Sequence, residues 1–293
     1  MNHFSLKLTA LHAGRDLLSL LIGRYKGIGP ERAEVALHKG FVRVNGLVVR
    51  ENRELQKGDL LEADFTWFLQ KKIFAEDLPL DVRYEDDDIL VVNKAAGMAC
   101  HAGLGVFYGT LLNAVMHYHQ QNGIKAIENG IVHRLDKETS GLILLARSEA
   151  AFKVLKPRFA EEKNERRYHA WLAGTMEADA GELTWAMGRD PENERCIKVM
   201  DKGKACLTKF KTQERVNNMS LVEAYPLTGR THQLRVHFSH AGHPILGDKR
   251  YGGETQLSRM YLFASALGFL HPLSGKPLYI ELDKAEISRP EGL

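Results

Sequence analysis

The sequence predicts an α+β protein in two parts, a small module followed by a larger domain with a mixed, mostly antiparallel sheet. A length of 293 residues suggests two domains. The first 60 or so residues show two helical patterns and then a hairpin signal, whereas short strand patterns alternate with scattered helices from about Leu78. This mixture is typical of α+β architecture. We place the module at 1–66, a linker at 67–77 and the larger domain at 78–293.

The composition narrows the class of protein. Hydrophobic residues make up 44% of the chain, charged residues 26%, and the net charge is +3, as in ordinary globular proteins. The three cysteines form no CxxC pair, which argues against a disulfide framework or thiolate zinc site and predicts a cytoplasmic location. There is no secretory signal and no run of about 18 apolar residues, so we expect no membrane association. Without a heptad pattern or large apolar stripe, we expect a monomer.

The first elements belong to the small module. A helical apolar pattern covers residues 11–25, and a second helix is predicted from Pro30 to about His38, because proline suits a first helical turn. Gly40 ends that helix. Alternating β-formers in residues 41–50 flank Asn45-Gly46, a strong hairpin signal, and another strand follows at 60–63.

This pattern of two helices, VNG (44–46) and KGD (57–59) resembles the RNA-binding module named after ribosomal small-subunit protein four. The resemblance implies that the helices and the adjacent loop contact the RNA backbone. The predicted contacts are Arg15, Arg32, Lys39 and Arg43. An ordinary solvated basic surface is the alternative interpretation.

The larger domain contains interleaved strand and helix patterns. Strands are predicted at 89–92, 131–132, 142–146, 168–172, 207–211 and 220–224, and helices at 110–119, 148–162 and 231–241.

The stretch HRLDKETSG (133–141) lies between two apolar runs. Short polar loops held by buried strands often carry catalytic groups, although a charged hairpin tip in solvent is the alternative. The order of residues excludes the kinase H-R-D-L motif, and the chain contains no phosphate-binding P-loop. It also lacks the G-x-S-x-G motif of serine hydrolases.

Metal binding is not predicted. Two sets of histidines come close in sequence, His117 with His119, and His237 with His240 and His243. The second set has i, i+3, i+6 spacing, so its members do not all share one helix face. No acidic partner motif accompanies either set.

A second informative stretch, LTGRTHQLRVH (227–237), is predicted to be a turn entering a helix capped by Thr228 or Thr231. Its spacing would place His232, Arg235 and Phe238 on one face. A bidentate arginine beside Asp136 would favour the charged carboxylate. A purely structural ion pair is the alternative.

Five motifs together resemble the RluA-type pseudouridine synthases over about residues 78–285. They are HRLDKETSGLILLAR (133–147), LTGRTHQLRVHFSHAGHPILGDKRYGG (227–253), DDILVVNKAAGM (87–98), RYHAWLAG (167–174) and YLFASALGFLHP (261–272). The resemblance implies a catalytic domain of that fold. It also implies conversion of uridine in RNA to pseudouridine, with no cofactor, nucleotide or metal.

The resemblance also assigns the catalytic residues. Asp136 matches the essential aspartate, which attacks the ribose, attacks the ring or removes a ribose proton. Arg235 matches the arginine that positions it. Tyr168 matches the tyrosine that stacks on the target base and relays a proton late in the reaction.

The predicted substrate-binding residues are Arg134, Leu262, His133 and Thr139. Arg134 fills the gap left by the flipped base or contacts nearby RNA. Leu262 lines the pocket or simply packs in the core, and His133 and Thr139 shape the loop.

The expected partner is RNA, with large-subunit ribosomal RNA favoured over transfer RNA. Two rival functions remain open at this point. One is a non-catalytic RNA-binding or ribosome-assembly factor on the same scaffold, and the other is a hydrolase that uses Asp136 with His133 or His232.

Overall fold

The computed structural model describes residues 3–24, 28–65, 73–102, 108–127, 129–161, 164–193, 196–253 and 256–290. The chain divides into two compact units, residues 1–78 with 101–117 and residues 79–100 with 118–293. No sequence pattern indicated that 101–117 would group with the N-terminal unit. Part of the predicted linker, 67–72, lies outside the described residues, and the domain boundaries stay a prediction. Within the described ranges, no helix is long and apolar enough to cross a membrane.

The N-terminal unit contains a four-stranded antiparallel sheet in the order β1-β4-β2-β3. Its elements are β1 (His3–Lys7), α1 (Leu17–Arg24), α2 (Pro30–His38), β2 (Val42–Val44), β3 (Leu47–Val48) and β4 (Leu60–Asp64). The hairpin prediction is confirmed, because Asn45 and Gly46 both have positive φ angles, as the turn requires. The predicted start of the first helix at residue 11 is wrong. Gly14 is left-handed, and the Asp16 carboxylate accepts the Ser19 N–H, so the helix begins at Leu17.

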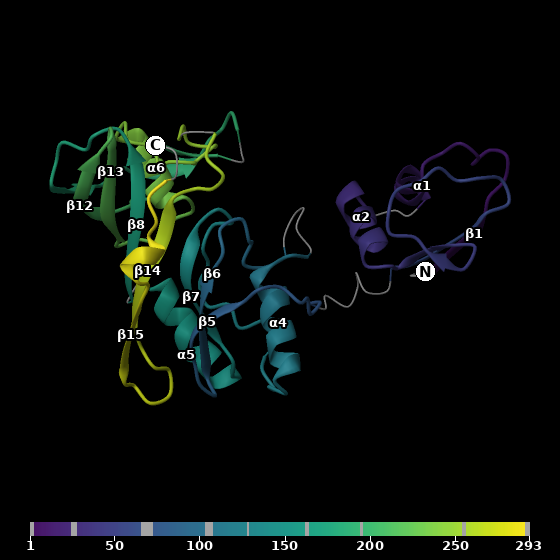
Figure 1. Ribbon diagram of the computed structural model, residues 1–293, viewed down its shortest axis with the longest axis horizontal. Coiled ribbons are helices and arrows are strands. Elements are labelled where there is room, and N and C mark those ends of the chain that lie inside the picture. Colours follow the sequence, from purple (N-terminus) through teal and green to yellow (C-terminus); the bar gives the residue numbers. More distant parts are fainter. Residues whose placement is uncertain are drawn as a thin grey trace. The chain divides into compact units, whose positions relative to one another are not determined.

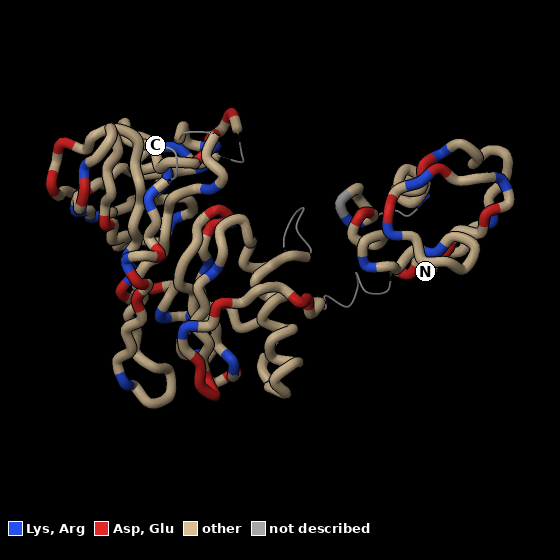
Figure 2. The backbone as a smooth tube through the Cα atoms, in the orientation of Figure 1, with Lys and Arg blue, Asp and Glu red and all other residues tan. Residues whose placement is uncertain are grey.

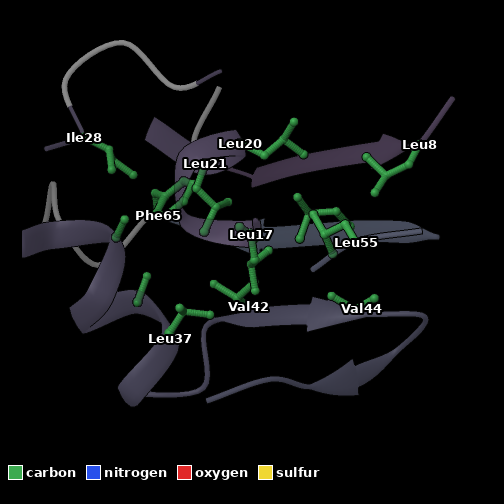
Figure 3. Close-up of a cluster of buried hydrophobic side chains, with 14 residues drawn as sticks. Leu8, Leu17, Leu20, Leu21, Ile28, Leu37, Val42, Val44, Leu55 and Phe65 are labelled. Carbon is green, nitrogen blue, oxygen red and sulfur yellow. The ribbon is translucent and has the colours of Figure 1, made fainter. Parts of the chain in front are cut away.

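This unit has its own hydrophobic core. Figure 3 shows side chains of α1, α2 and the strands turned toward one another, with Leu17, Leu21 and Val42 at most 1% exposed. Figure 2 shows Lys and Arg interspersed with Asp and Glu over the same unit. The unit therefore has a folded interior and a surface of mixed charge.

The second unit is built on one large sheet in the order β5-β6-β7-β14-β8-β13-β12-β9, with β15 paired to β14. The elements of the second unit are β5 (Asp81–Glu85), β6 (Ile89–Lys94), β7 (Ser140–Ala146), α5 (Glu149–Ala160), β8 (Glu165–Ala173), β9 (Ala180–Leu183), β10 (Met187–Arg189), β11 (Ile197–Val199), β12 (Thr208–Val216), β13 (Met219–Pro226), α6 (Gln233–His240), β14 (Leu262–Leu270), β15 (Pro277–Glu281) and the 3-10 turn Lys284–Glu286. The helix α4 (Leu111–Gln121) begins in residues grouped with the first unit and ends in the second. Among the described strands of this sheet, β7 and β14 are the parallel pair and the other pairings are antiparallel. The predicted α+β class with a mostly antiparallel sheet is confirmed.

Some predicted elements differ from the structure. The strand expected at 131–132 is an isolated bridge between Ile131 and Leu145. β14 was not predicted, because its nearly fully buried sequence LFASALGFL lacks the alternation of a half-exposed strand.

Two apolar clusters pack against different parts of the sheet, one including side chains of α5 and the other side chains of α6. Figure 1 shows these two helices at different places along the sheet. Leu155 and Phe159 of α5 pack with Leu144 of β7 in one cluster. Phe238 of α6 packs with Val222 of β13 in the other. β7 contributes side chains to the first cluster, β8 to the second and β14 to both, so these three neighbouring strands are all packed into the hydrophobic core.

A hydrogen-bonded cluster ties the turn before β6 to the end of β14. Asp86 Oδ1 accepts the N–H groups of Asp88 and Ile89 at 2.9 Å, and its Oδ2 lies 3.1 Å from His271 Nε2. Because His271 Nδ1 accepts two backbone N–H groups, the ring proton is on Nε2 and is donated to Asp86. Asp86, Asp88 and His271 lie close enough to hold a metal ion. In this tautomer, however, Nε2 has no free electron pair for one.

Asp86→Asn is expected to lower the free energy of unfolding by about 1–2 kcal/mol near pH 7, since hydrogen bonds to a charged group are lost. Burial acts to raise the pKa of Asp86, but the donors around it hold the pKa below its usual value. Its stabilisation is therefore present above about pH 4 and is lost as the pH falls through the folded-state pKa. Urea unfolding at about pH 7 and pH 3 measures this, and the exposed neighbour Asp87→Asn is the control. An equal loss at both pH values would contradict the ionic explanation.

Candidate functional site

The HRLDKETSG loop borders a small pocket in the second unit. Its cavity volume is about 130 Å³, which is smaller than the ~300–1,000 Å³ of pockets for drug-sized ligands and suits a single ring. The lining includes Arg134, Asp136, Thr139, Arg166, Tyr168, Leu262, Pro226 and residues 228–235. Six of the seven predicted catalytic and substrate-binding residues line this pocket. Arg134, Asp136 and Thr139 come from the loop, whereas Tyr168 comes from β8, Arg235 from α6 and Leu262 from β14.

Strand register explains why these segments meet. Phe263 at the start of β14 pairs with Ser140 of β7, and on its other side Leu262 pairs with Ala170 of β8. Because Ser140 directly follows Thr139, this arrangement places the end of the loop beside Leu262. Tyr168 of β8 pairs with Ala264, so its ring enters the pocket from the same junction.

Gly141 makes the β7–β14 junction possible. Its φ is +116°, and a Cβ atom there would lie 2.3 Å from the Ala264 carbonyl oxygen. Gly141→Ala is expected to cost at least about 3 kcal/mol of unfolding free energy, because backbone strain and a backbone clash combine. Gly123→Ala is the matched control, since Gly123 also has positive φ but has open space around it, and it should cost about 1 kcal/mol. Similar losses for the two variants in urea unfolding would contradict a role for the close approach.

The loop is supported from behind by buried groups. Lys94 is 1% exposed, and its Nζ donates to the carbonyl oxygens of Ala95, Met98 and Lys137 at 2.8, 2.8 and 3.2 Å. Burial lowers the pKa of Lys94 to about 8. The buried Cys100 thiol donates to the Leu135 carbonyl at 3.2 Å. These contacts fix the backbone on both sides of Asp136.

Arg235 lies within ion-pair distance of Asp136, but its geometry differs from the predicted bidentate pair. Its Nε and Nη2 donate to the two carboxylate oxygens of Asp248 at 2.7 and 2.8 Å. Its Nη1 lies 3.4 Å from Asp136 Oδ2 and 3.7 Å from Glu138 Oε2. Arg235 and Asp248 are 3% and 1% exposed. Burial acts to lower the pKa of Arg235, but Asp248 raises it, so the guanidinium stays charged. Asp248 thus anchors the cation that faces Asp136.

Tyr168 and His133 have different surroundings. Burial raises the pKa of the Tyr168 phenol, so the group is neutral at physiological pH. His133 does not line the pocket. Its ring stacks on Phe159 at 4.3 Å, and its Nε2 accepts the Leu144 N–H at 3.0 Å. Burial lowers the pKa of His133 to about 3. The ring therefore anchors the start of the loop to β7 and α5.

The predicted caps of α6 are wrong. The N-cap residue is His232, in the left-handed conformation with φ 56°, and its side chain does not cap the helix. Thr228 instead donates to Gln233 Oε1 at 2.8 Å, and the same oxygen accepts the Arg230 N–H at 3.1 Å. His232 and Arg235 both line the pocket, whereas Phe238 is buried in the core.

Comparison with known proteins shows which family this chain belongs to. A sequence model of the family described as RNA pseudouridylate synthase matches residues 88–240, more than half of the chain. This chain belongs to the RNA pseudouridylate synthase family.

The curated relatives agree with this assignment. The uncharacterized RNA pseudouridine synthase YlyB of Bacillus subtilis is 38% identical over 248 residues, covering 83% of this chain and 81% of that one. Ribosomal large subunit pseudouridine synthase C of Escherichia coli is 33% identical over 302 residues, covering 94% and 91%. The solved structure of human RNA pseudouridylate synthase domain containing 1 has a TM-score of 0.60 and 28% identity, covering 72% and 85%.

The predicted resemblance to RluA-type synthases is therefore confirmed for the catalytic domain, and the protein is an RNA pseudouridine synthase. The predictions missed two residues of this synthase's site, Asp248 and Tyr251, although both lie within the quoted motif GDKRYGG (247–253). Their positions follow a loop after α6, and no periodic pattern indicates which side chain turns back toward Arg235.

Proposed function

We propose that Asp136 is the essential carboxylate of this synthase and acts on a uridine held in the 130 Å³ pocket. The observation that carries the proposal is the position of Asp136 Oδ2, 3.4 Å from the Nη1 of a buried arginine whose other nitrogens are held by Asp248. This arrangement fixes the carboxylate at the pocket wall beside a guanidinium group. The reaction is an isomerisation in which the bond from ribose to ring nitrogen 1 breaks and a bond to ring carbon 5 forms. It requires no redox partner.

We assign the remaining pocket residues by their positions. Tyr168 stacks on the uracil, and as a neutral phenol it needs help from its neighbours to accept a proton. Leu262 and Thr139 complete the wall. Arg134 is exposed at the pocket and fills the gap left when the nucleotide flips out, which costs a few kcal/mol.

We further propose large-subunit ribosomal RNA as the substrate, with transfer RNA as the second candidate. The relatives named ribosomal large subunit pseudouridine synthases C and D support this choice. Synthase D of Xylella fastidiosa is 32% identical over 284 residues, covering 92% of this chain and 85% of that one.

The N-terminal residues 1–66 are proposed to bind RNA in the manner of the small-subunit protein four module. Arg15, Arg32 and Arg43 are exposed on it, whereas Lys39 forms an ion pair with Glu76. Such a module would add affinity for the RNA backbone, and this affinity would offset the cost of flipping the base out. The affinity should weaken as the salt concentration rises. We still predict that the protein is cytoplasmic, is a monomer and needs no cofactor.

Tritium release tests the proposal. RNA labelled at uracil ring carbon 5 is taken from cells that lack this gene and is separated into large-subunit ribosomal RNA and transfer RNA. Each fraction is then incubated with the full chain. We expect release from the large-subunit fraction. Release from transfer RNA alone would overturn the substrate assignment. Binding of RNA without release from either fraction would favour the rival non-catalytic RNA-binding factor.

A further inference from the structure

His232 combines an unusual backbone conformation with a position beside Asp136. Its φ of 56° is left-handed, a region that non-glycine residues occupy rarely and at some cost. An N-cap residue usually has extended backbone and accepts a helix N–H with its side chain. His232 does neither. The left-handed backbone of His232 therefore orients its ring and does not help to cap the helix.

The ring is fixed by Tyr251. His232 Nδ1 lies 2.6 Å from the Tyr251 hydroxyl, and the two rings meet edge to face at 72°. The same hydroxyl accepts the Ile197 N–H at 3.1 Å, so its own proton is available for Nδ1. Tyr251 also lies under the Arg235 guanidinium, 5.1 Å from it. One tyrosine thus contacts both residues that face Asp136.

The other ring nitrogen points to the carboxylate. His232 Nε2 is 3.9 Å from Asp136 Oδ2, the oxygen that also faces Arg235 Nη1. Burial lowers the pKa of His232, opposed by Asp136, so the ring is neutral and carries one proton. A proton on Nε2 lets Nδ1 accept from Tyr251 and turns an N–H toward Asp136. The other tautomer would set an electron pair against a carboxylate.

We propose that His232 is a positioning residue for the isomerisation, which donates its Nε2 proton to Asp136 Oδ2 and, with Arg235, fixes the direction in which the carboxylate acts. The inference rests on the proposed role of Asp136. Hydrogen bonds in catalytic sites are often long without substrate and shorten in the reacting complex. A small shift of the Asp136 carboxylate toward His232 Nε2 would bring the two atoms within hydrogen-bonding distance.

The test uses His232→Gly, because glycine accepts the left-handed backbone without strain and leaves a space that free imidazole can fill. Tritium release is measured with the labelled RNA described above, at mildly alkaline pH where imidazole is neutral. We expect kcat to fall roughly 10- to 100-fold, as for loss of other groups that orient an active residue, with KM unchanged. Millimolar imidazole should restore much of the lost rate. Potassium chloride at matched ionic strength should not.

Tyr251→Phe provides a second measurement that does not depend on rescue. It should lower kcat in the same direction, and the double variant His232→Gly/Tyr251→Phe should lose little more than His232→Gly alone. A His232→Gly protein with wild-type kcat would overturn the inference. The inference would also be overturned if a folded His232→Gly protein changed in KM rather than kcat, or if imidazole restored none of its rate. The same holds if its loss of rate adds fully to the loss in Tyr251→Phe. If the wild type itself releases no tritium, the proposed function fails instead.

Discussion

Replacing Asp136 by Asn is expected to reduce tritium release by at least about 10³-fold, because the amide cannot attack the substrate or accept a proton as the carboxylate does. Asn has nearly the same shape as Asp, and Asp136 is partly exposed in its loop rather than part of the core. Unfolding and RNA binding should therefore change little. The measurement is single-turnover release from labelled RNA, together with a binding isotherm for the same RNA.

Glu138→Gln is the matched control. Glu138 lies in the same loop, and its Oε2 is 3.7 Å from the same Arg235 nitrogen, but it does not line the pocket of Asp136. Its loss should leave release within a few fold of the wild type. Equal release by Asp136→Asn and the wild type would remove Asp136 from the mechanism. An equal loss in both variants would indicate that total charge around Arg235 matters rather than the Asp136 carboxylate.

The second large effect is expected for Asp248→Asn. This change keeps the shape of the side chain but leaves the buried Arg235 without its bidentate partner. Breaking a buried ion pair by removing one charge costs about 3–5 kcal/mol of unfolding free energy. Activity should fall as well, because Arg235 would lose the anchor that holds its Nη1 toward Asp136. Urea unfolding and tritium release measure the two consequences separately.

The double variant Arg235→Met/Asp248→Asn separates stability from function. Without the guanidinium no unpaired charge is buried, so the variant should recover much of the stability lost in Asp248→Asn. Its activity should not recover, since the Arg235 guanidinium that faces Asp136 Oδ2 is gone. A double variant less stable than Asp248→Asn would contradict the unpaired-charge explanation. Wild-type stability of Asp248→Asn would contradict the importance of the pair for the fold.

The sequence by itself determined the local features of this protein. The Asn45-Gly46 hairpin and the helix Pro30–His38 follow from turn chemistry and helix signals that act between near neighbours. The fold class follows from the order of strand and helix patterns. The motif around Asp136, with the four others, resembles the RluA-type synthases, and the match of the family model over residues 88–240 bears out that resemblance.

Tertiary structure alone decided how the site is assembled. The position of β14 between β7 and β8 brings Leu262 to Tyr168 and Asp136, and that register depends on the close approach at Gly141. The partner of Arg235 was equally unpredictable. Asp136 lies 99 residues from Arg235 in sequence and Asp248 lies 13 residues away. Only their placement in the fold pairs two guanidinium nitrogens with Asp248 and a single one with Asp136. Which side chains pair across loops follows no periodicity in the sequence, so a pattern of residue types does not predict these pairs.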